Sequence, residues 1–342
     1  MVASPQLLAN RTFCTLDYWL YQRHASKDDV EVVKIDAMKI GYLGPEGTFT
    51  QEALRTQSDL NGLDLIPYSS IAILLEAVQD DQIEMGFVPI ENSIEGTVAV
   101  TIDSLIFDCD LVIVREVVHN IHLQLLGISG AVMDDIAEIW SYSHALAQCR
   151  RFLAHNVGAA NIKESLSTAD GAYRVASSRD IRIAAIAPRI AGEIYQLVEL
   201  ATNIEDHDEN QTRFYLVRKG PIPKPTGHDK TSIACFQLAD APGSLFSILA
   251  EFSARNINLT KLESRPSKLG LGQYCFVIEF DGHIAEPIVG DLFLSLRRKL
   301  ADIKFLGSFP NAKITEQDVN NTTKLTPDEA SRWVEDIRRR IE

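Results

Sequence analysis

The sequence has little that is typical of a membrane protein or a nucleic-acid-binding protein. No apolar run approaches the roughly 20 residues that a membrane-spanning helix needs. Lys and Arg number 33 against 47 Asp and Glu, and the formal net charge of −14 argues against general binding to nucleic acid or anionic membrane. If the substrate is an anion, the positively charged side chains that bind it must be gathered at its site. The first residues also lack the basic, apolar and small-residue order of a secretory signal, which predicts a cytoplasmic location.

Disulfide, metal and nucleotide chemistry are weakly supported as well. The five cysteines are Cys14, Cys109, Cys149, Cys235 and Cys275. Their number is odd and none has a C-x-x-C spacing, so we expect buried free thiols rather than disulfides or a zinc site. His119 and His122 are three residues apart in a strand-like segment and would face opposite sides, unable to chelate one metal. HExxH, Walker and GxGxxG patterns are lacking, so we expect neither a metal nor a cofactor.

The length and composition describe two globular domains with appendages. The chain has 342 residues, of which 46% are hydrophobic and 23% charged. Residues 1–38 fit nothing that follows and are interpreted as an N-terminal extension, because Met38 precedes the first clean strand. Its Trp19 would still allow the extension to dock on the core. Residues 311–342 are predicted to be a polar tail that ends in a helix capped by Thr326.

Residues 39–219 alternate short apolar strands with helices. Examples are "KIGYLG" before "PEGTFTQEAL", "EMGFVPI" before "ENSIEGTVAVTIDSLIF", and "IAEIWSYS" before "HALAQCRRFLAHN". Such alternation predicts parallel sheets with helical crossovers. A long strand-like segment, "LVIVREVVHNIHLQLLGI", divides the region into two α/β halves, as in a two-lobed, hinged binding fold.

A Pro/Gly linker at 220–230 separates this region from a smaller module at 231–310. The predicted elements are strand 231–238, helix 244–255, strand 257–265, strand 272–280, helix 286–300 and strand 303–309. This βαββαβ order is ferredoxin-like.

Polar side chains follow several of the predicted strands. Ligands of open α/β sheets bind outside the carboxyl ends of the strands, so each of these junctions is a candidate site. Thr48 opens a helix in "GPEGTFTQ", and Ser167 and Thr168 open another in "SLSTADG". Thr48-x-x-Gln51 and Ser167-x-x-Asp170 also have the spacing of helix caps. A cap and an anion site are compatible, so both interpretations stay open.

Further polar candidates lie in three other segments. Asn92 and Ser93 follow a buried strand, where they make a turn or place an amide and a hydroxyl on a substrate. His144 begins a predicted helix, where a polar cap is more usual than a base. Thr212 and Arg213 open the apolar run "FYLV", either at a surface turn or at a catalytic edge. The spacing alone predicts a site for a small polyoxygenated anion, without the activated nucleophile of acyl transfer.

Several segments together resemble the prephenate dehydratase family: "GYLGPEGTFT", "VPIENSIEGTV", "LSTADGA" and "NQTRFYLV". The module at 231–310 is similar to a phenylalanine-responsive ACT domain in "DAPGSLFSILAEFSARNINLTKLESRP". The resemblance implies an α/β protein with a two-lobed, periplasmic-binding-protein-like catalytic domain at 39–219 and a ferredoxin-like ACT domain. It further implies the conversion of prephenate to phenylpyruvate, with loss of water and carbon dioxide and without a cofactor.

The same resemblance implies roles for individual residues. Thr212 would be catalytic and donate a hydrogen bond or proton to the departing hydroxyl; because its hydroxyl is a very weak acid, hydrogen bonding is the safer description. Arg213 would hold a substrate carboxylate or, alternatively, form an ion pair that orients the strand. Phe214 would point the other way from Arg213 and support the site. The implied substrate-binding residues are Thr48, Asn92, Ser93, Ser167, Thr168, Arg213 and Phe214.

An L-phenylalanine site is implied between helix 244–255 of one subunit and strand 257–265 of another, which requires a homodimer or homotetramer. Its implied residues are Gly243, Ser244, Leu245, Asn256, Glu263 and Ser264. Two residues depart from the family pattern: His144 stands where many members carry glutamine, and Ser244 where many carry alanine. The module has a second interpretation as a dimerisation platform without ligand. Arogenate dehydratase and a non-catalytic amino-acid sensor are the alternatives for the whole chain.

Overall fold

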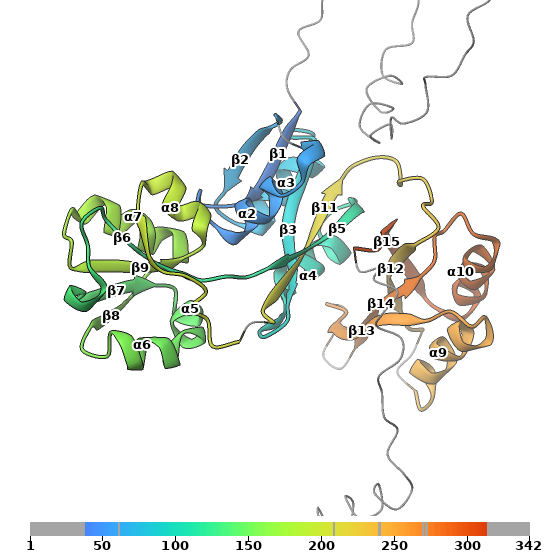
Figure 1. The fold of residues 1–342 in the computed structure, drawn as a ribbon. Coiled ribbons are helices and arrows are strands. Elements are labelled where there is room, and N and C mark those ends of the chain that lie inside the picture. Colours follow the sequence, from blue (N-terminus) through green and yellow to red (C-terminus); the bar gives the residue numbers. More distant parts are fainter. Residues whose placement is uncertain are drawn as a thin grey trace, which may run out of the picture.

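The structure is a computed structural model that describes residues 38–312, apart from 61, 208, 239–240, 269 and 271–272. The predicted N-terminal extension with Trp19, and the predicted tail helix after Thr326, lie outside the described residues. None of the described helices is both long and apolar enough to cross a membrane. Figure 1 shows three units in a row, two lobes followed by a C-terminal domain.

The first lobe is built on a six-stranded sheet of order β2-β1-β3-β11-β5, with β4 paired to β3. Its strands are β1 (Lys39–Leu43), β2 (Asp64–Tyr68), β3 (Met85–Asn92), β4 (Gly96–Thr97), β5 (Val112–Asn120) and β11 (Gln211–Arg218). Its helices are α2 (Phe49–Arg55), α3 (Ile71–Gln79) and α4 (Ala99–Phe107), with a short 3-10 turn η1 (Ser58–Leu60). The sheet is mixed, because β1 runs parallel to β2 and β3 while β11 is antiparallel to β3 and β5.

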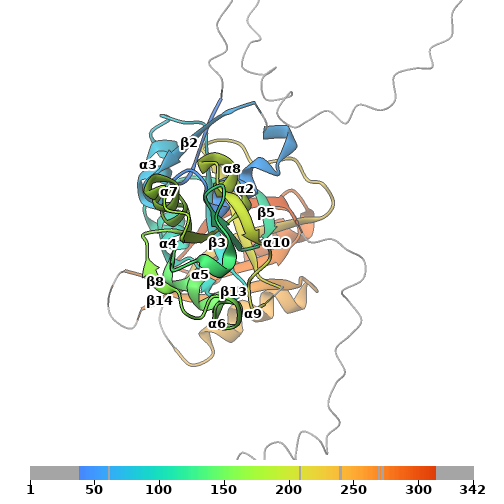
Figure 2. The ribbon, with the colours of Figure 1, turned by 60° about the vertical axis from the view of Figure 1, so that its left-hand side comes forward.

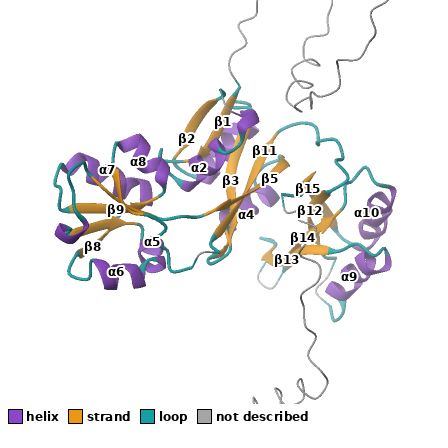
Figure 3. Ribbon diagram, viewed as in Figure 1, coloured by secondary structure: helices purple, strands orange, loops and turns teal. Residues whose placement is uncertain are grey.

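The second lobe holds a five-stranded sheet of order β10-β6-β9-β7-β8. Its strands are β6 (Gln124–Gly127), β7 (Glu138–Ser141), β8 (Asn161–Glu164), β9 (Ile183–Ala187) and β10 (Val198–Ala201). Its helices are α5 (Ser143–Gln148), α6 (Arg150–Asn156), α7 (Thr168–Ser178) and α8 (Arg189–Tyr195), with a 3-10 turn η2 (Met133–Asp135). Helices and strands alternate in this lobe as the sequence predicts (Figure 3).

The long strand-like segment at 111–128 does divide the two lobes. It breaks at residues 121–123 into β5 in the first lobe and β6 in the second, and the chain returns through β11 (Figure 1). These crossings explain why the sheets are mixed rather than parallel, since the strands that enter and leave each lobe run against their neighbours. The single helix predicted from His144 is two helices, α5 and α6, which meet at Cys149 with a non-helical ψ of 17°.

The C-terminal domain has the predicted ferredoxin-like order. Its elements are β12 (Asp229–Phe236), α9 (Ser244–Ala254), β13 (Leu259–Pro266), β14 (Tyr274–Asp281), α10 (Pro287–Lys299) and β15 (Asp302–Pro310). The sheet order is β13-β14-β12-β15, and all three pairings are antiparallel. Both helices pack on one face of this sheet, and the other face lies toward the first lobe (Figures 1 and 2).

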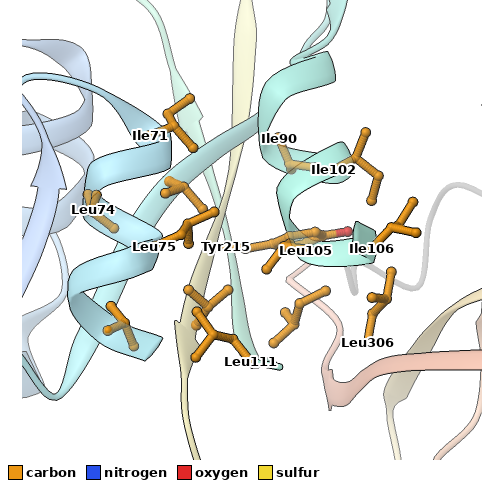
Figure 4. Close-up of a cluster of buried hydrophobic side chains, with 14 of the residues drawn as sticks. Ile71, Leu74, Leu75, Ile90, Ile102, Leu105, Ile106, Leu111, Tyr215 and Leu306 are labelled. Carbon is orange, nitrogen blue, oxygen red and sulfur yellow. The ribbon is translucent and has the colours of Figure 1, made fainter. Parts of the chain in front are cut away.

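Part of the interface between the first lobe and the C-terminal domain is an apolar core that the two units share. Leu306 and Phe309 of β15 share one buried cluster with side chains of α3 and α4 and with Tyr215 of β11 (Figure 4). At Gly307, with φ 149°, an added Cβ would lie 2.4 Å from the carbonyl oxygen of Ile113 in β5. The backbones of β15 and β5 approach so closely that only glycine fits, and the two units are therefore firmly packed.

Candidate functional site

Asn92 and Thr212 are direct neighbours across the β3–β11 ladder. Asn92 Nδ2 donates to Thr212 Oγ1 at 2.9 Å. The orientation of this amide is fixed, because its Oδ1 accepts from the backbone N–H groups of Ile94 at 2.9 Å and Glu95 at 3.0 Å. Since Thr212 Oγ1 accepts the bond from Asn92, its own O–H proton is not used in that bond and can be donated to a ligand.

Hydrogen bonds of Ser93 connect the start of β11 to the end of β3. Its backbone N–H donates to the carbonyl of Gln211 at 2.8 Å, and its hydroxyl accepts from the N–H of Gln211 at 2.9 Å. The same hydroxyl donates to the carbonyl of Glu209 at 3.2 Å. Ser93 therefore fixes the backbone on which Thr212 stands, and direct contact of Ser93 with substrate stays a prediction.

A polar network continues from Asn92 into the second lobe. Asn92 Nδ2 also donates to Asn210 Oδ1 at 2.9 Å, and Asn210 Nδ2 donates to Gln148 Oε1 at 2.9 Å. Gln148 Nε2 in turn donates to Glu95 Oε1 at 3.2 Å, and Glu95 Oε2 lies 2.6 Å from Nδ1 of His144. His144, which departs from the family pattern, therefore contacts a carboxylate of the opposite lobe.

Sequence reasoning missed three members of this network, Glu95, Asn210 and Gln148. Glu95 and Asn210 lie within "VPIENSIEGTV" and "NQTRFYLV", two segments that carry the family resemblance, and this was the signal that could have found them. Gln148 lies in the predicted helical segment "HALAQCRRFLAHN". Their side chains meet only because the lobes fold toward each other, which no local pattern encodes.

The other predicted hydroxyls lie at helix starts. Thr48 Oγ1 accepts from the N–H of Gln51 at 3.4 Å, and Gln51 Oε1 accepts from the N–H of Gly47 at 2.7 Å, which is the expected cap of α2. Ser167 Oγ accepts from the N–H of Asp170 at 3.0 Å and caps α7, whose first residue is Thr168. The helix caps are therefore present, and a ligand-binding role for these hydroxyls stays a prediction.

Arg213 has a different surrounding from Thr212, because successive residues of a strand point to opposite faces. Its guanidinium donates to Glu116 at 3.0 Å, Glu279 at 2.5 Å and Glu91 at 2.7 Å, and its side chain is 13% exposed. Glu279 lies on β14, so this ion cluster joins the first lobe to the C-terminal domain. Of the two roles predicted for Arg213, the ion pair is present. Contact of Arg213 with a substrate carboxylate stays a prediction.

Charges within the cluster stabilise one another. Burial alone would raise the pKa of Glu116, but the positive charges of Lys230 and Arg213 outweigh it and hold that pKa below its usual value. Lys230 Nζ lies 3.1 Å from Glu116. Burial and the charge of Glu279 raise the pKa of Tyr215 well above its usual value, so its neutral phenol donates to Glu279. The cluster therefore links β5 and β11 with β12 and β14.

Phe214 points away from Arg213, as the alternation of the strand predicts. Its ring is 1% exposed and stacks on Phe87 with centroids 5.1 Å apart. It belongs to the apolar cluster beneath α2. The structure therefore gives Phe214 a supporting place in the core, and contact with substrate stays a prediction.

The C-terminal domain holds a pocket of about 450 Å³. Three of the six predicted effector residues, Gly243, Ser244 and Leu245, line it together with Leu249 and Phe276. Ser264 pairs with Phe276 in the β13–β14 register and so lies beside the pocket.

The two remaining effector candidates lie elsewhere in the chain. Glu263 faces the first lobe, where its Oε2 accepts from Thr97 Oγ1 at 2.8 Å. Asn256 follows the far end of α9 with φ 53°. Within a single chain, therefore, Glu263 and Asn256 are not brought together with Gly243.

Comparison with known proteins gives matches over most of the chain. A family model described as prephenate dehydratase matches residues 40–221, and one described as ACT domain matches 232–291. A curated relative from Amycolatopsis methanolica, named prephenate dehydratase, is 40% identical over 279 residues, covering 80% of this chain and 89% of the relative.

Two solved structures share this architecture over most of the chain. One is a prephenate dehydratase from Arthrobacter aurescens in complex with L-Phe, with 35% identity, a TM-score of 0.75, and coverage of 88% of this chain and 100% of that chain. Another, described as a novel type of quorum-quenching acylase, has 27% identity, a TM-score of 0.73, and coverage of 80% of this chain and 97% of that chain.

Proposed function

This chain belongs to the prephenate dehydratase family and is an enzyme of that activity, and we propose that its reaction takes place around Thr212 at the junction of the two lobes. Prephenate loses a ring hydroxyl as water and a ring carboxylate as carbon dioxide, and the product is phenylpyruvate. The observation that carries the proposal is the bond from Asn92 to Thr212, because it leaves the threonine proton for the substrate.

The chemistry asks little of the protein beyond an oriented donor. As the carboxylate leaves as carbon dioxide, its bonding electrons move into the ring, and the C–O bond breaks with its electrons on the hydroxyl. The group leaves as hydroxide and becomes water by taking a proton from the solvent. Aromatisation drives this step, so the enzyme needs to stabilise the developing negative charge on that oxygen. A preorganised hydrogen bond of this kind is worth about 10²–10³ in rate. We assign this bond to Thr212, with Asn92 fixing its direction.

We propose that the anionic groups of the substrate are held by the polar groups at the carboxyl ends of the strands. Backbone N–H groups at the starts of helices attract anions, and Thr48, Ser167 and Thr168 stand at two such starts. Arg213 is assigned a supporting role, because its guanidinium is shared among three carboxylates.

We also propose feedback control by L-phenylalanine, bound in the pocket that Gly243 and Leu245 line. The related protein from Arthrobacter aurescens carries L-Phe, which supports this assignment. Because Glu263 and Asn256 lie away from the pocket in one chain, a second subunit would be needed to bring them to it. We therefore propose that the protein is a homodimer or homotetramer. We also propose that it is located in the cytoplasm.

Arogenate dehydratase is the nearest alternative, since arogenate differs from prephenate by an amine in place of a keto group. A pure amino-acid sensor would not need Thr212. Acyl transfer needs a nucleophile beside a base, whereas Thr212 Oγ1 is hydrogen-bonded to the side-chain amide of Asn92. The test is to incubate the purified protein with prephenate and, in parallel, with arogenate. We expect phenylpyruvate from prephenate at the higher kcat/KM; turnover of arogenate alone would contradict the proposal.

A further inference from the structure

His119 lies beside the proposed catalytic threonine. Thr212 of β11 is paired with Asn92 of β3 on one side and with His119 of β5 on the other. Residues directly opposite each other in antiparallel strands project from the same face of the sheet, with Cβ atoms about 5 Å apart. The two side chains that flank Thr212 on its own face are therefore an amide and an imidazole, and the imidazole is the one that can take up a charge.

The imidazole of His119 is held by a carboxylate. Its Nε2 lies 3.1 Å from Oε2 of Glu52 in α2, and the histidine side chain is 17% exposed. Because an ionised carboxylate only accepts hydrogen bonds, Nε2 carries the proton of this bond. Among the residues that the structure describes, none forms a hydrogen bond with the other ring nitrogen, Nδ1.

Glu52 is fixed in turn by the second lobe. Its Oε1 accepts from the N–H of Ile190 at 3.3 Å, at the start of α8. Glu52 lies in the first turn of α2, which Thr48 caps. The imidazole of His119 therefore lies between Thr212 and the first turn of α2, within the region proposed for the substrate.

The face of the sheet that carries Thr212 needs a positive charge, because prephenate is a dianion. Of the basic side chains of β5 and β11, Arg213 lies on the opposite face among three carboxylates. Arg115 is bound at 2.9 Å and 2.6 Å by a carboxylate of the turn η1, and Arg218 stands at the far end of β11. This leaves His119 as the basic side chain of these two strands that can meet the substrate.

We infer that His119 is a further substrate-binding residue, whose imidazolium is held by Glu52 and donates its Nδ1–H to a carboxylate of prephenate. A ring that lies between two carboxylates is favoured in its positively charged form. The inference rests on the proposed site around Thr212 and adds a cation to it.

The carboxylate that His119 binds is the one on the pyruvyl side chain. This carboxylate stays charged throughout the reaction, so a cation beside it stabilises the substrate and the transition state equally. A cation beside the ring carboxylate would instead stabilise a charge that is lost when carbon dioxide leaves, and would oppose the reaction.

The test is the steady-state kinetics of His119→Gln with prephenate. Glutamine places an amide N–H where histidine has Nε2, so the bond to Glu52 is kept while the positive charge and Nδ1 are lost. Loss of one hydrogen bond between charged groups corresponds to about a 10-fold rise in KM, with kcat changed less than about 2-fold. If His119 only supported Glu52, the same variant would keep the wild-type KM.

Inhibition by the product identifies the carboxylate that is bound. Phenylpyruvate keeps the side-chain carboxylate of prephenate and has lost the ring carboxylate. Its inhibition constant should therefore rise in His119→Gln by about the same factor as KM. A rise in KM with the inhibition constant unchanged would overturn the assignment to the side-chain carboxylate.

Two further variants complete the experiment. Glu52→Gln keeps an acceptor for the N–H of Ile190 but removes the negative charge that balances the imidazolium, so it should also raise KM; it tests the inference if His119→Gln does not fold. His155→Gln is the control, because His155 is exposed on α6 in the second lobe with Nδ1 2.6 Å from the carbonyl of Arg151. This control should keep the wild-type KM.

The outcomes separate this inference from the proposed role of Thr212. A wild-type KM in both His119→Gln and Glu52→Gln, whatever the change in kcat, would overturn the role of His119, as would an equal rise in His155→Gln. Full turnover by Thr212→Val would instead overturn the proposed catalytic role of Thr212.

Discussion

Arg213 Nη2 lies 2.7 Å from Glu91 Oε2, one residue along both strands from the hydrogen bond between Asn92 and Thr212. The Asn92–Thr212 pair and the Glu91–Arg213 pair lie side by side in the same stretch of sheet. Because neighbouring residues on a strand face opposite sides, the two pairs project from opposite faces of the sheet. The second pair continues through Glu279 into β14 of the C-terminal domain. The proposed catalytic pair is therefore built on the strands that hold the domains together.

The ion cluster at the domain interface should contribute strongly to stability. We expect Glu279→Gln to lower the free energy of unfolding by about 3 kcal/mol, because it leaves the buried guanidinium of Arg213 without one of its carboxylates. Urea denaturation at pH 7 measures this. Asp81→Asn is the control, since its pair with Lys219 is exposed and should contribute less than about 1 kcal/mol. Similar losses in the two variants would contradict this account.

The same cluster predicts a dependence of stability on acid. Burial raises the pKa of Glu116 and of Glu91, but neighbouring cations outweigh it and leave each pKa below its usual value. A carboxylate of this kind stabilises the fold above its usual pKa, and the contribution is lost as the pH falls through the lower folded value. We expect the free energy of unfolding of the wild-type protein to fall more steeply between about pH 5 and pH 3 than that of the Glu116→Gln variant. Parallel slopes would show that the cluster carries no such linkage.

Close packing of β15 on β5 should make Gly307 intolerant of any side chain. An added Cβ would lie 2.4 Å from Ile113 O, so Gly307→Ala should detach the C-terminal domain or lower the thermal midpoint. Gly290→Ala is the matched control in α10, where nothing lies within 4 Å of the added Cβ. It should be neutral or stabilise by up to about 1 kcal/mol, as alanine does in helices. Limited proteolysis across the linker and thermal melts distinguish the two variants.

The effector pocket can be tested by filling it. Leu249→Trp should abolish binding and inhibition by L-phenylalanine without lowering turnover of prephenate, because the larger ring occupies the pocket that Leu249 lines. Leu294→Trp, at a residue 62% exposed on α10, is the control and should retain inhibition. Isothermal titration of the full chain measures binding. Loss of L-phenylalanine binding in both variants, or in neither, would argue against this pocket.

The sequence predicts the C-terminal domain well, because its elements are separated by clear turns and linkers and its order is ferredoxin-like. The two lobes also follow from the alternation of strands and helices and from the long segment around His119. The pairing of Asn92 with Thr212 does not follow, because it depends on the register of two strands that are 120 residues apart.

The surroundings of Arg213 could be predicted only in part from the sequence. Alternation along a strand already separates it from Thr212, but the sequence does not show that the C-terminal sheet covers its face. Likewise, Asn210 lies within "NQTRFYLV" and Gln148 within a predicted helix, and only the folded lobes bring them into one network.

The most direct measurement is the turnover of prephenate by Thr212→Val. Valine has nearly the shape of threonine and suits a strand, so circular dichroism and the thermal midpoint should be unchanged. We predict that kcat falls by about 10²–10³, as expected for loss of one preorganised donor. A well-folded Thr212→Val protein that forms phenylpyruvate at a near-normal rate would contradict the account.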